Sequence, residues 1–280
     1  MKKMVALLLA LVLIVALAAC EATPPASSVD ETVQSVEQTE TPDAAETNDE
    51  NFGDEHKIPY TGLTEIEGAA GVEREADVEN SPYFSHPDFA NMKSTDTLTL
   101  LEGFKTIQQA TEWTCGPTSA LMVLEWYGKR GDLNEMDLAA LRGDPSPGAT
   151  DLKEMIDIFE GLALLSDFPH GLWDLYSTYD LEDSDYVPED FIQNTLADGH
   201  PILLGWDDWG GHWQVIIGYD TMGTETTADD VLVLADPYDT TDHNQDGYYI
   251  ISFERLYYNW LNGFDSDFSR NLFLVATPTE

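Results

Sequence analysis

Apolar side chains recur at helical spacing in the first part of the folded region. Residues 117–128 are apolar on nearly every face, with a proline in the first turn and a glycine at the end, which predicts a buried helix. Residues 150–162 carry apolar side chains on one face only, which predicts a helix with its other side in water. Two shorter helices are predicted at residues 133–143 and 188–199, each ending at a glycine.

The pattern changes further along the chain. Short apolar, β-branched runs are now separated by Gly, Asp and Pro, and such runs predict strands. Helices followed by strands favour an α+β fold with an antiparallel sheet. Residues 58–91 show no clear pattern. The predicted strands are residues 201–206, 212–219, 230–237, 246–252 and 271–277, and residues 252–261 predict one more helix.

The N-terminus has the features of an export signal. Two lysines precede an uninterrupted apolar run, residues 4–19, which ends in the letters LAAC. This ending resembles the lipobox of bacterial lipoproteins, and a plain secretory signal is the alternative. The resemblance implies cleavage before Cys20 and lipidation of its thiol. We therefore expect residues 1–19 to be a lipoprotein signal peptide and the mature protein to be held outside the cytoplasmic membrane by a lipid.

Composition divides the rest of the chain in two. Residues 20–57 are mostly acidic and small polar residues with few aromatics, which predicts a disordered acidic tether. Residues 58–280 are rich in aromatic and aliphatic side chains and are expected to form one domain. The formal net charge of −41 disfavours nucleic acid as a partner and favours cations or basic peptides. High acidity that only keeps the protein soluble is the alternative.

The chain contains only two cysteines, Cys20 and Cys115. If Cys20 carries a lipid, Cys115 has no partner for a disulfide within the chain. It is then either an apolar filler of the core or a working thiol. Cys115 lies just before a predicted helix, where unpaired amides and the helix dipole favour a thiolate. Gly116 would let the backbone come close to a substrate.

Three further residues could complete a nucleophilic site around Cys115. His212 follows two glycines and opens a predicted strand, and Asp236 ends the next one. If these strands form a hairpin, the imidazole and the carboxylate meet at one end of it. Gln109, six residues before Cys115, could donate its amide to an oxyanion, with Gln108 as the neighbouring alternative. Taken singly, Cys115 and His212 could be structural, and Asp236 could be a turn residue.

The three segments together resemble a known family. The letters QATEWTCGPTSALMVLEWYG, GGHWQVIIGYD and VLVLADPYD are similar to papain-like bacterial peptidases related to the bacteriocin double-glycine leader peptidases. The motif core spans residues 104–239. The resemblance implies a papain-like cysteine peptidase fold, in which a buried helix carrying the cysteine packs on an antiparallel sheet carrying the histidine and aspartate. It also implies a peptide or protein substrate and no required cofactor.

The same resemblance implies a role for each site residue. Cys115 is the expected nucleophile, His212 the general base, Asp236 the group that orients the base, and Gln109 the oxyanion donor. Two alternatives to peptide hydrolysis remain open: acyl transfer to an amine on the same fold, and a non-catalytic surface module that binds peptides or cell-wall material.

Other residues near these motifs suggest a substrate groove. Trp113 and Trp213 flank the proposed nucleophile and base, so they could wall a groove, or they could pack in the core. Asp207 and Asp208 lie just before the histidine and would favour basic side chains in a substrate if they are exposed.

A possible cation site lies at residues 239–249. Asp242, Asn244 and Asp246 alternate along the chain and precede Gly247, which resembles the first half of a calcium loop. The position expected to hold a bidentate acid is Phe253, so the resemblance is incomplete. An Asx-rich turn between strands is the alternative to calcium binding.

Overall fold

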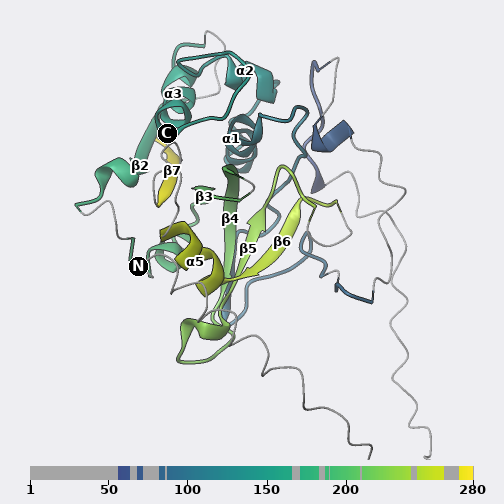
Figure 1. Cartoon of the computed structure of the whole chain (residues 1–280), viewed down its shortest axis with the longest axis vertical. Coiled ribbons are helices and arrows are strands. Elements are labelled where there is room, and N and C mark those ends of the chain that lie inside the picture. Colours follow the sequence, from purple (N-terminus) through teal and green to yellow (C-terminus); the bar gives the residue numbers. More distant parts are fainter. Residues whose placement is uncertain are drawn as a thin grey trace, which may run out of the picture. The chain divides into compact units, whose positions relative to one another are not determined.

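The structure is a computed structural model, shown in Figure 1. The predicted signal peptide, Cys20 and nearly all of the predicted tether lie outside the residues that it describes. Among the described residues no helix is long and apolar enough to cross a membrane. The described residues are 56–63, 68–71, 82–85, 87–165, 171–182, 187–188, 190–208, 210–240, 245–261 and 271–279.

Within these described residues, seven strands form a single antiparallel sheet in the order β2-β7-β3-β4-β5-β6, with β1 paired to β4. Strand β3 pairs with the first half of β4 and β1 with its last residues, so the two follow one another along the same edge of β4. The strands are β1 (Leu98–Leu100), β2 (Trp173–Ser177), β3 (Ile202–Trp206), β4 (His212–Asp220), β5 (Val231–Ala235), β6 (Tyr248–Ser252) and β7 (Leu272–Pro278).

In the described part of the chain, five α-helices pack around this sheet. Helix α1 is apolar on every side and buried from Cys115 to Leu124, and it lies against β4, to which the Ser119 hydroxyl donates a hydrogen bond at the carbonyl of Trp213 (3.0 Å). In Figure 1, α1 lies at the end of the sheet where β4 begins. The helices are α1 (Cys115–Trp126), α2 (Glu135–Ala139), α3 (Leu152–Leu162), α4 (Asp190–Ala197) and α5 (Phe253–Leu261).

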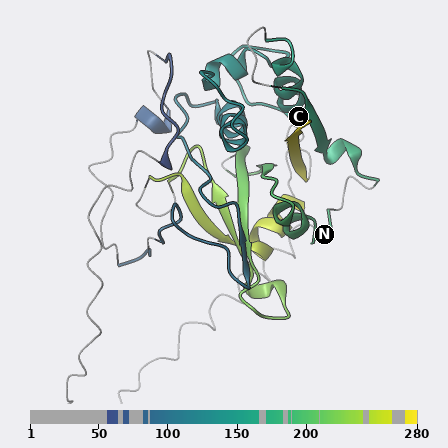
Figure 2. The ribbon, with the colours of Figure 1, turned by 180° about the vertical axis from the view of Figure 1, so that it is seen from behind.

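An N-terminal segment, residues 56–63 and 68–71, runs beside the chain that leads into α1. We call this segment the strap (dark blue in Figure 2). Its backbone makes a parallel bridge from Lys57 to Thr106, and the N–H groups of Gly68 and Ala70 donate to the carbonyls of Ala110 (2.8 Å) and Gln109 (3.1 Å). The strap therefore supports the segment that carries the predicted oxyanion donor.

The predicted α+β architecture is confirmed, and each predicted helix and strand has a counterpart in the structure. Two short strands, β1 and β2, had not been predicted. Strand β2 lies between α3 and α4 and pairs with β7 at one edge of the sheet, so one strand interrupts the part of the chain where only helices were predicted.

Candidate active site

Cys115 is a free thiol at the first residue of α1, one position inside the helix rather than just before it. Its N–H is therefore one of the first four in a helix, which have no partner within that helix. Thr114 is the N-cap residue of α1, and its side chain makes no capping hydrogen bond. The thiol and the unpaired N–H groups of the first turn thus lie at the same end of the helix, where the dipole favours negative charge.

His212 is positioned by the hairpin that joins β3 to β4. It pairs with Trp206 across the hairpin, at the first position of β4. The connecting turn ends in Gly210 and Gly211, both with positive φ (88° and 117°), a conformation that residues with a side chain rarely adopt. The two glycines before the histidine are therefore needed to make the turn.

Asp236 follows β5 directly, and its carboxylate meets the imidazole. The Nε2 atom of His212 lies 2.7 Å from Oδ1 of Asp236. The same carboxylate accepts from the backbone N–H of Tyr238 (2.8 Å) and from Nε2 of Gln214 (2.9 Å). With Nε2 of His212 engaged in this way, Nδ1 is the ring nitrogen that remains for Cys115.

The surroundings of His212 favour its protonated form. Burial by itself lowers the pKa of the imidazole. The carboxylate of Asp236 and the hydrogen bond and charge of Cys115 outweigh that effect and raise the pKa to about 10. The imidazolium of His212 thus lies between the Asp236 carboxylate and Cys115.

Gln214 is a site residue that the sequence analysis missed. Its Oε1 accepts from Nε1 of Trp206 (2.8 Å) and from the hydroxyl of Tyr249 (3.2 Å), and these two donors orient the amide so that its nitrogen faces Asp236. The available signal was its position two residues after His212, because alternate residues of a strand share a face of the sheet.

The two neighbouring glutamines have different roles. Nε2 of Gln108 donates to the backbone carbonyl of Asp236 (2.9 Å), and its Oε1 accepts from the N–H of Asp239 (2.9 Å), so Gln108 ties down the chain after β5. Gln109 reaches the cavity instead. One hydrogen of its amide goes to the carbonyl of Thr111 (2.7 Å), and the other is available to a ligand.

A cavity of about 160 Å³ brings these groups together. Cys115, His212, Asp236 and Gln109 all line it, although they come from α1, β4, the end of β5 and the segment before α1. The complete lining is Gln109, Glu112, Cys115, Asp208, Gly211, His212, Asp236 and Tyr238.

The sequence profile described as the Peptidase_C39 like family matches residues 101–263, more than half of the chain. The chain belongs to this family. It is a cysteine-type peptidase, and a peptidase implies a peptide or protein substrate. None of the curated proteins matches the sequence.

One solved structure is similar to this peptidase at low sequence identity. It is the crystal structure of xylellain, a cysteine protease from Xylella fastidiosa, at 12% identity with a TM-score of 0.40. The similarity covers 78% of this chain and 100% of the xylellain chain.

Two carboxylates of the peptidase face the cavity beside the nucleophile and the base. Glu112 lies three residues before Cys115 and is exposed, and its carboxylate accepts from the hydroxyl of Tyr238 (3.4 Å). Burial raises the pKa of Asp208; His212 opposes this effect, and Asp236 adds to it. Asp207 is exposed and does not line the cavity. A positive charge brought into the cavity would relieve the repulsion among the acids.

Neither tryptophan walls the cavity of the peptidase. Trp213 is fully buried, and its Nε1 donates to the carbonyl of Thr150 (2.7 Å), so core packing is its role. Trp113 is half-buried and stacks under the Arg142 guanidinium, 4.9 Å from the ring centre. Of the two alternatives, core packing therefore holds for Trp213, and Trp113 lies outside the cavity lining.

Gly116 has a packing role that was not predicted. A Cβ at this position would lie 2.7 Å from Cβ of Thr150, so the missing side chain makes room for another part of the same chain. This close approach is internal, between the start of α1 and the residue just before the cap of α3. Gly116 does not line the cavity, and its contact with a substrate stays a prediction.

The predicted calcium loop is only partly described. Asp242 and Asn244 lie outside the described residues. Oδ1 of Asp246 accepts from the N–H of Tyr248 (2.8 Å), which is an Asx turn of the kind named as the alternative. In the described part of the chain no three potential metal ligands cluster. Calcium binding stays a prediction, which a calcium-dependent rise in melting temperature would support.

Proposed function

We propose that the protein hydrolyses peptide bonds through a Cys115–His212–Asp236 triad, with Gln109 as an oxyanion donor. The proposal rests chiefly on the 2.7 Å hydrogen bond between His212 and Asp236 in a cavity that Cys115 also lines. A nucleophile, a base and a group that orients the base are the minimum set for this chemistry.

The proposed reaction runs in two halves. The thiolate of Cys115 attacks the peptide carbonyl, and the resulting oxyanion accepts hydrogen bonds from the Cys115 N–H and the free amide hydrogen of Gln109. His212 gives its Nδ1 proton to the leaving amine as the C–N bond breaks, which leaves a thioester. Neutral His212 then takes a proton from water as the water attacks, and the thiolate departs with the acid product released.

The experiment that tests this function is active-site labelling of the full chain. A peptide carrying a thiol-reactive group should label Cys115, and the label should be located by mass spectrometry of the digested protein. Cys115→Ala should abolish both labelling and the hydrolysis of a fluorogenic peptide mixture. Hydrolysis that survives in Cys115→Ala would refute the assignment.

We further propose that the substrate carries basic side chains near the bond that is cut. Glu112 and Asp208 line the cavity together with the reacting groups, and among the described residues no Lys or Arg lines it. Asp208→Asn should reduce the ratio of hydrolysis rates for basic over neutral peptides by up to about fivefold, because a single solvated charge pair contributes up to about 1 kcal/mol. Asp207→Asn is the matched control, and an unchanged ratio in Asp208→Asn would contradict the proposal.

We also propose that the protein is a lipoprotein held outside the bacterial cytoplasmic membrane by lipidated Cys20. The support is the sequence of the first twenty residues, in which a basic start and an apolar run end at LAAC.

A further inference from the structure

A buried carboxylate lies behind the candidate oxyanion donors and has no part in the triad. Glu135 is the first residue of α2 and is 1% exposed. Within the described part of the chain it forms no salt bridge. Burial raises the pKa of this carboxyl, and hydrogen bonds from Thr114 and Ala110 partly offset the effect. Burying a carboxylate without a cation costs folding free energy, so stability does not explain the position of Glu135.

The hydrogen bonds of Glu135 join the two segments that carry the proposed oxyanion donors. The N–H of Ala110, the residue after Gln109, donates to both carboxylate oxygens (2.9 and 3.0 Å). The hydroxyl of Thr114, the residue before Cys115, donates to Oε1 (2.5 Å). The Glu135 carboxylate thus links the segment that carries Gln109, the side-chain donor, to the segment that carries the N–H of Cys115, the backbone donor.

We propose that Glu135 is the positioning residue of the oxyanion hole: it sets the separation between the Gln109 amide and the Cys115 N–H. The proposal rests on the proposed function, because it takes both groups as donors to the oxyanion. Preorganised donors stabilise the developing charge only when they lie at hydrogen-bonding distance from it, so a small displacement of either one slows the reaction.

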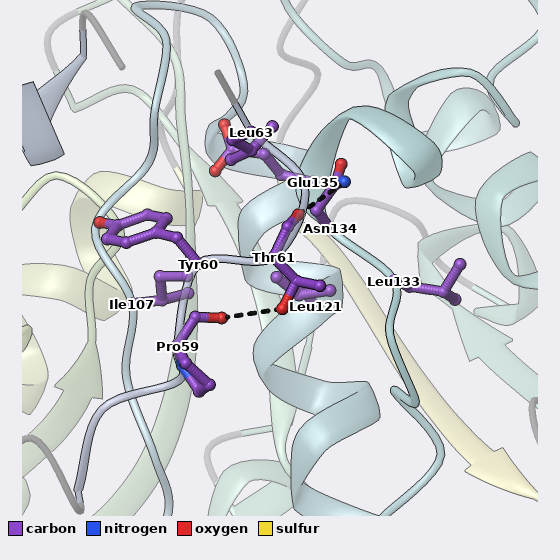
Figure 3. A pocket seen from close by; sticks show the side chains of 9 residues that line it. All are labelled: Pro59, Tyr60, Thr61, Leu63, Ile107, Leu121, Leu133, Asn134 and Glu135. Atoms are coloured by element: carbon purple, nitrogen blue, oxygen red, sulfur yellow. Dashed lines mark hydrogen bonds between the residues drawn. The ribbon is translucent and has the colours of Figure 1, made fainter. Parts of the chain in front are cut away.

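Other contacts keep water away from this carboxylate. Residues 59–61 of the strap cover it from one side, and Figure 3 shows Tyr60 and Thr61 next to Asn134, Glu135 and Ile107. The amide of Asn134 donates to the carbonyl of Thr61 (2.9 Å). The free space here is close to zero, so the region is packed protein and no ligand pocket.

The segment that carries Gln109 is also held from its other side. The N–H of Gln109 donates to the carbonyl of Pro237 (2.7 Å), in the chain that follows the triad aspartate. Glu135 provides the complementary link, from this segment to the start of α1. Without it, the segment would keep its contact with the aspartate side of the site and lose its fixed distance from Cys115.

The test compares two reactions of the same thiol in the full chain. Acylation by p-nitrophenyl acetate passes through an oxyanion, whereas alkylation by iodoacetamide displaces iodide and forms none. We expect Glu135→Ala to slow Cys115 acylation by roughly 10- to 100-fold, somewhat less than the loss of a donor itself, and to change the alkylation rate less than about twofold. Glu135→Gln, which retains an acceptor for Ala110 and a partner for Thr114, should recover most of the acylation rate.

A double-mutant cycle tests whether Glu135 acts through Gln109. If it does, Glu135→Ala should add little to the loss already caused by Gln109→Ala, because the donor to be positioned is gone. Equal losses in the two backgrounds would overturn the proposal. Thr114→Val removes the link to α1, together with the contact between the hydroxyls of Thr114 and Thr111 (2.8 Å). It should reduce acylation in the same selective way, which keeps the test open if Glu135→Ala does not fold.

Asp230→Ala is the matched control. Asp230 is also a buried carboxylate that accepts from a hydroxyl, that of Tyr219 (2.5 Å), but it precedes β5 at the end of the strand away from Asp236. This variant should lose stability without changing the ratio of acylation to alkylation. An unchanged ratio in Glu135→Ala as well would overturn the positioning role. Wild-type protein that reacts with iodoacetamide but shows no acylation at Cys115 would instead refute the proposed function itself.

Discussion

At the scale of single residues, the site is organised around one imidazole with two partners. Asp236 holds Nε2 of His212, and the carboxylate is in turn held by the amide of Gln214 and the N–H of Tyr238. Trp206 and Tyr249 orient that amide. The direction of the His212 ring is therefore determined by a chain of hydrogen bonds that runs into the core, so Nδ1 stays directed to the thiol.

The two groups of this pair should contribute unequally to catalysis. Replacing His212 removes the base from every proton transfer, whereas replacing Asp236 leaves a base that is poorly oriented. We expect Asp236→Ala to lower kcat by roughly 10⁴-fold and His212→Ala by a further factor of roughly 100. Steady-state rates on a fluorogenic peptide would measure both. His212→Ala with wild-type activity would end the triad assignment.

The raised pKa of His212 leads to a prediction about pH. Because its pKa lies at about 10, above its ordinary value of 6.5, the imidazolium persists through neutral pH. Its contribution to stability is complete below pH 6.5 and is lost as the pH rises through about 10. A cation next to Cys115 favours the thiolate, so iodoacetamide should alkylate the wild type readily at pH 6.

The comparison variant for this pH prediction is His212→Ala, which should lose most of the reactivity at pH 6 and regain it only in alkaline solution. Alkylation rates over a pH series, measured by mass spectrometry of the intact protein, provide the test. Slow alkylation of the wild type throughout that series would identify Cys115 as a core filler and exclude it as a nucleophile.

At the scale of elements, the pattern of apolar residues with its Gly, Asp and Pro boundaries predicted the runs that form α1, β4 and β5, the elements that position Cys115, His212 and Asp236. Each of these runs is strongly apolar, so burial dominates its structure. Strand β1 has three residues, and β2 alternates half-buried and exposed positions, so neither produces a clear pattern. The pairing of β2 with β7 is a long-range contact that no local pattern contains.

The parts of the site that were not predicted depend on packing between elements. Neighbours distant in the sequence decide which side of α1 contacts Thr150. They also decide that Trp213 points into the core. Acidic residues in the first turn of a helix are often exposed, so the position of Glu135 in α2 does not by itself predict burial. Its hydrogen bonds with Ala110 and Thr114 make it a buried link. The residues of the proposed triad could be picked out because their motifs are local, whereas the groups that support them could not.

The strap provides a test at the element scale. A Cβ on Gly68 would lie 2.5 Å from the carbonyl oxygen of Thr111, and a backbone atom cannot give way as a flexible side chain can. Gly68→Ala should therefore push the strap away from the Gln109 segment. We expect a loss of about 1–3 kcal/mol in the free energy of unfolding, with a lower kcat/KM for peptides.

Urea denaturation and peptide hydrolysis of the same preparation would measure both effects. Gly148→Ala is the matched control, because a Cβ there meets nothing within 4 Å and the glycine does not have a positive φ. Equal stability of Gly68→Ala and wild type would show that the strap does not depend on this close approach.

At the scale of the whole molecule, the family profile begins at residue 101, so the strap and everything before it lie outside the matched residues. The strap still contributes to the site, through its hydrogen bonds to Gln109 and Ala110. The whole chain has a formal net charge of −41, and the two carboxylates that line the cavity, Glu112 and Asp208, add negative charge at the site itself. The net charge would therefore attract a basic substrate to the molecule, and the cavity carboxylates would attract it to the site. Added salt should weaken the long-range attraction to the molecule more than the attraction within the cavity.

The prediction at this scale concerns the anchor. Lipidation needs the thiol of Cys20, whereas the proposed reaction needs the thiol of Cys115, so the two functions can be separated by single substitutions. Cys20→Ala in a bacterial host should prevent lipidation and move the protein from the membrane fraction to the soluble extracytoplasmic fraction or the medium. Cys115→Ala, the matched control, should remain membrane-bound but inactive. Fractionation with mass spectrometry of the N-terminal peptide would measure the first effect and peptide hydrolysis the second. A Cys20→Ala protein that is still lipidated would refute the lipobox interpretation, and one that is displaced but inactive would contradict the independence of anchor and site.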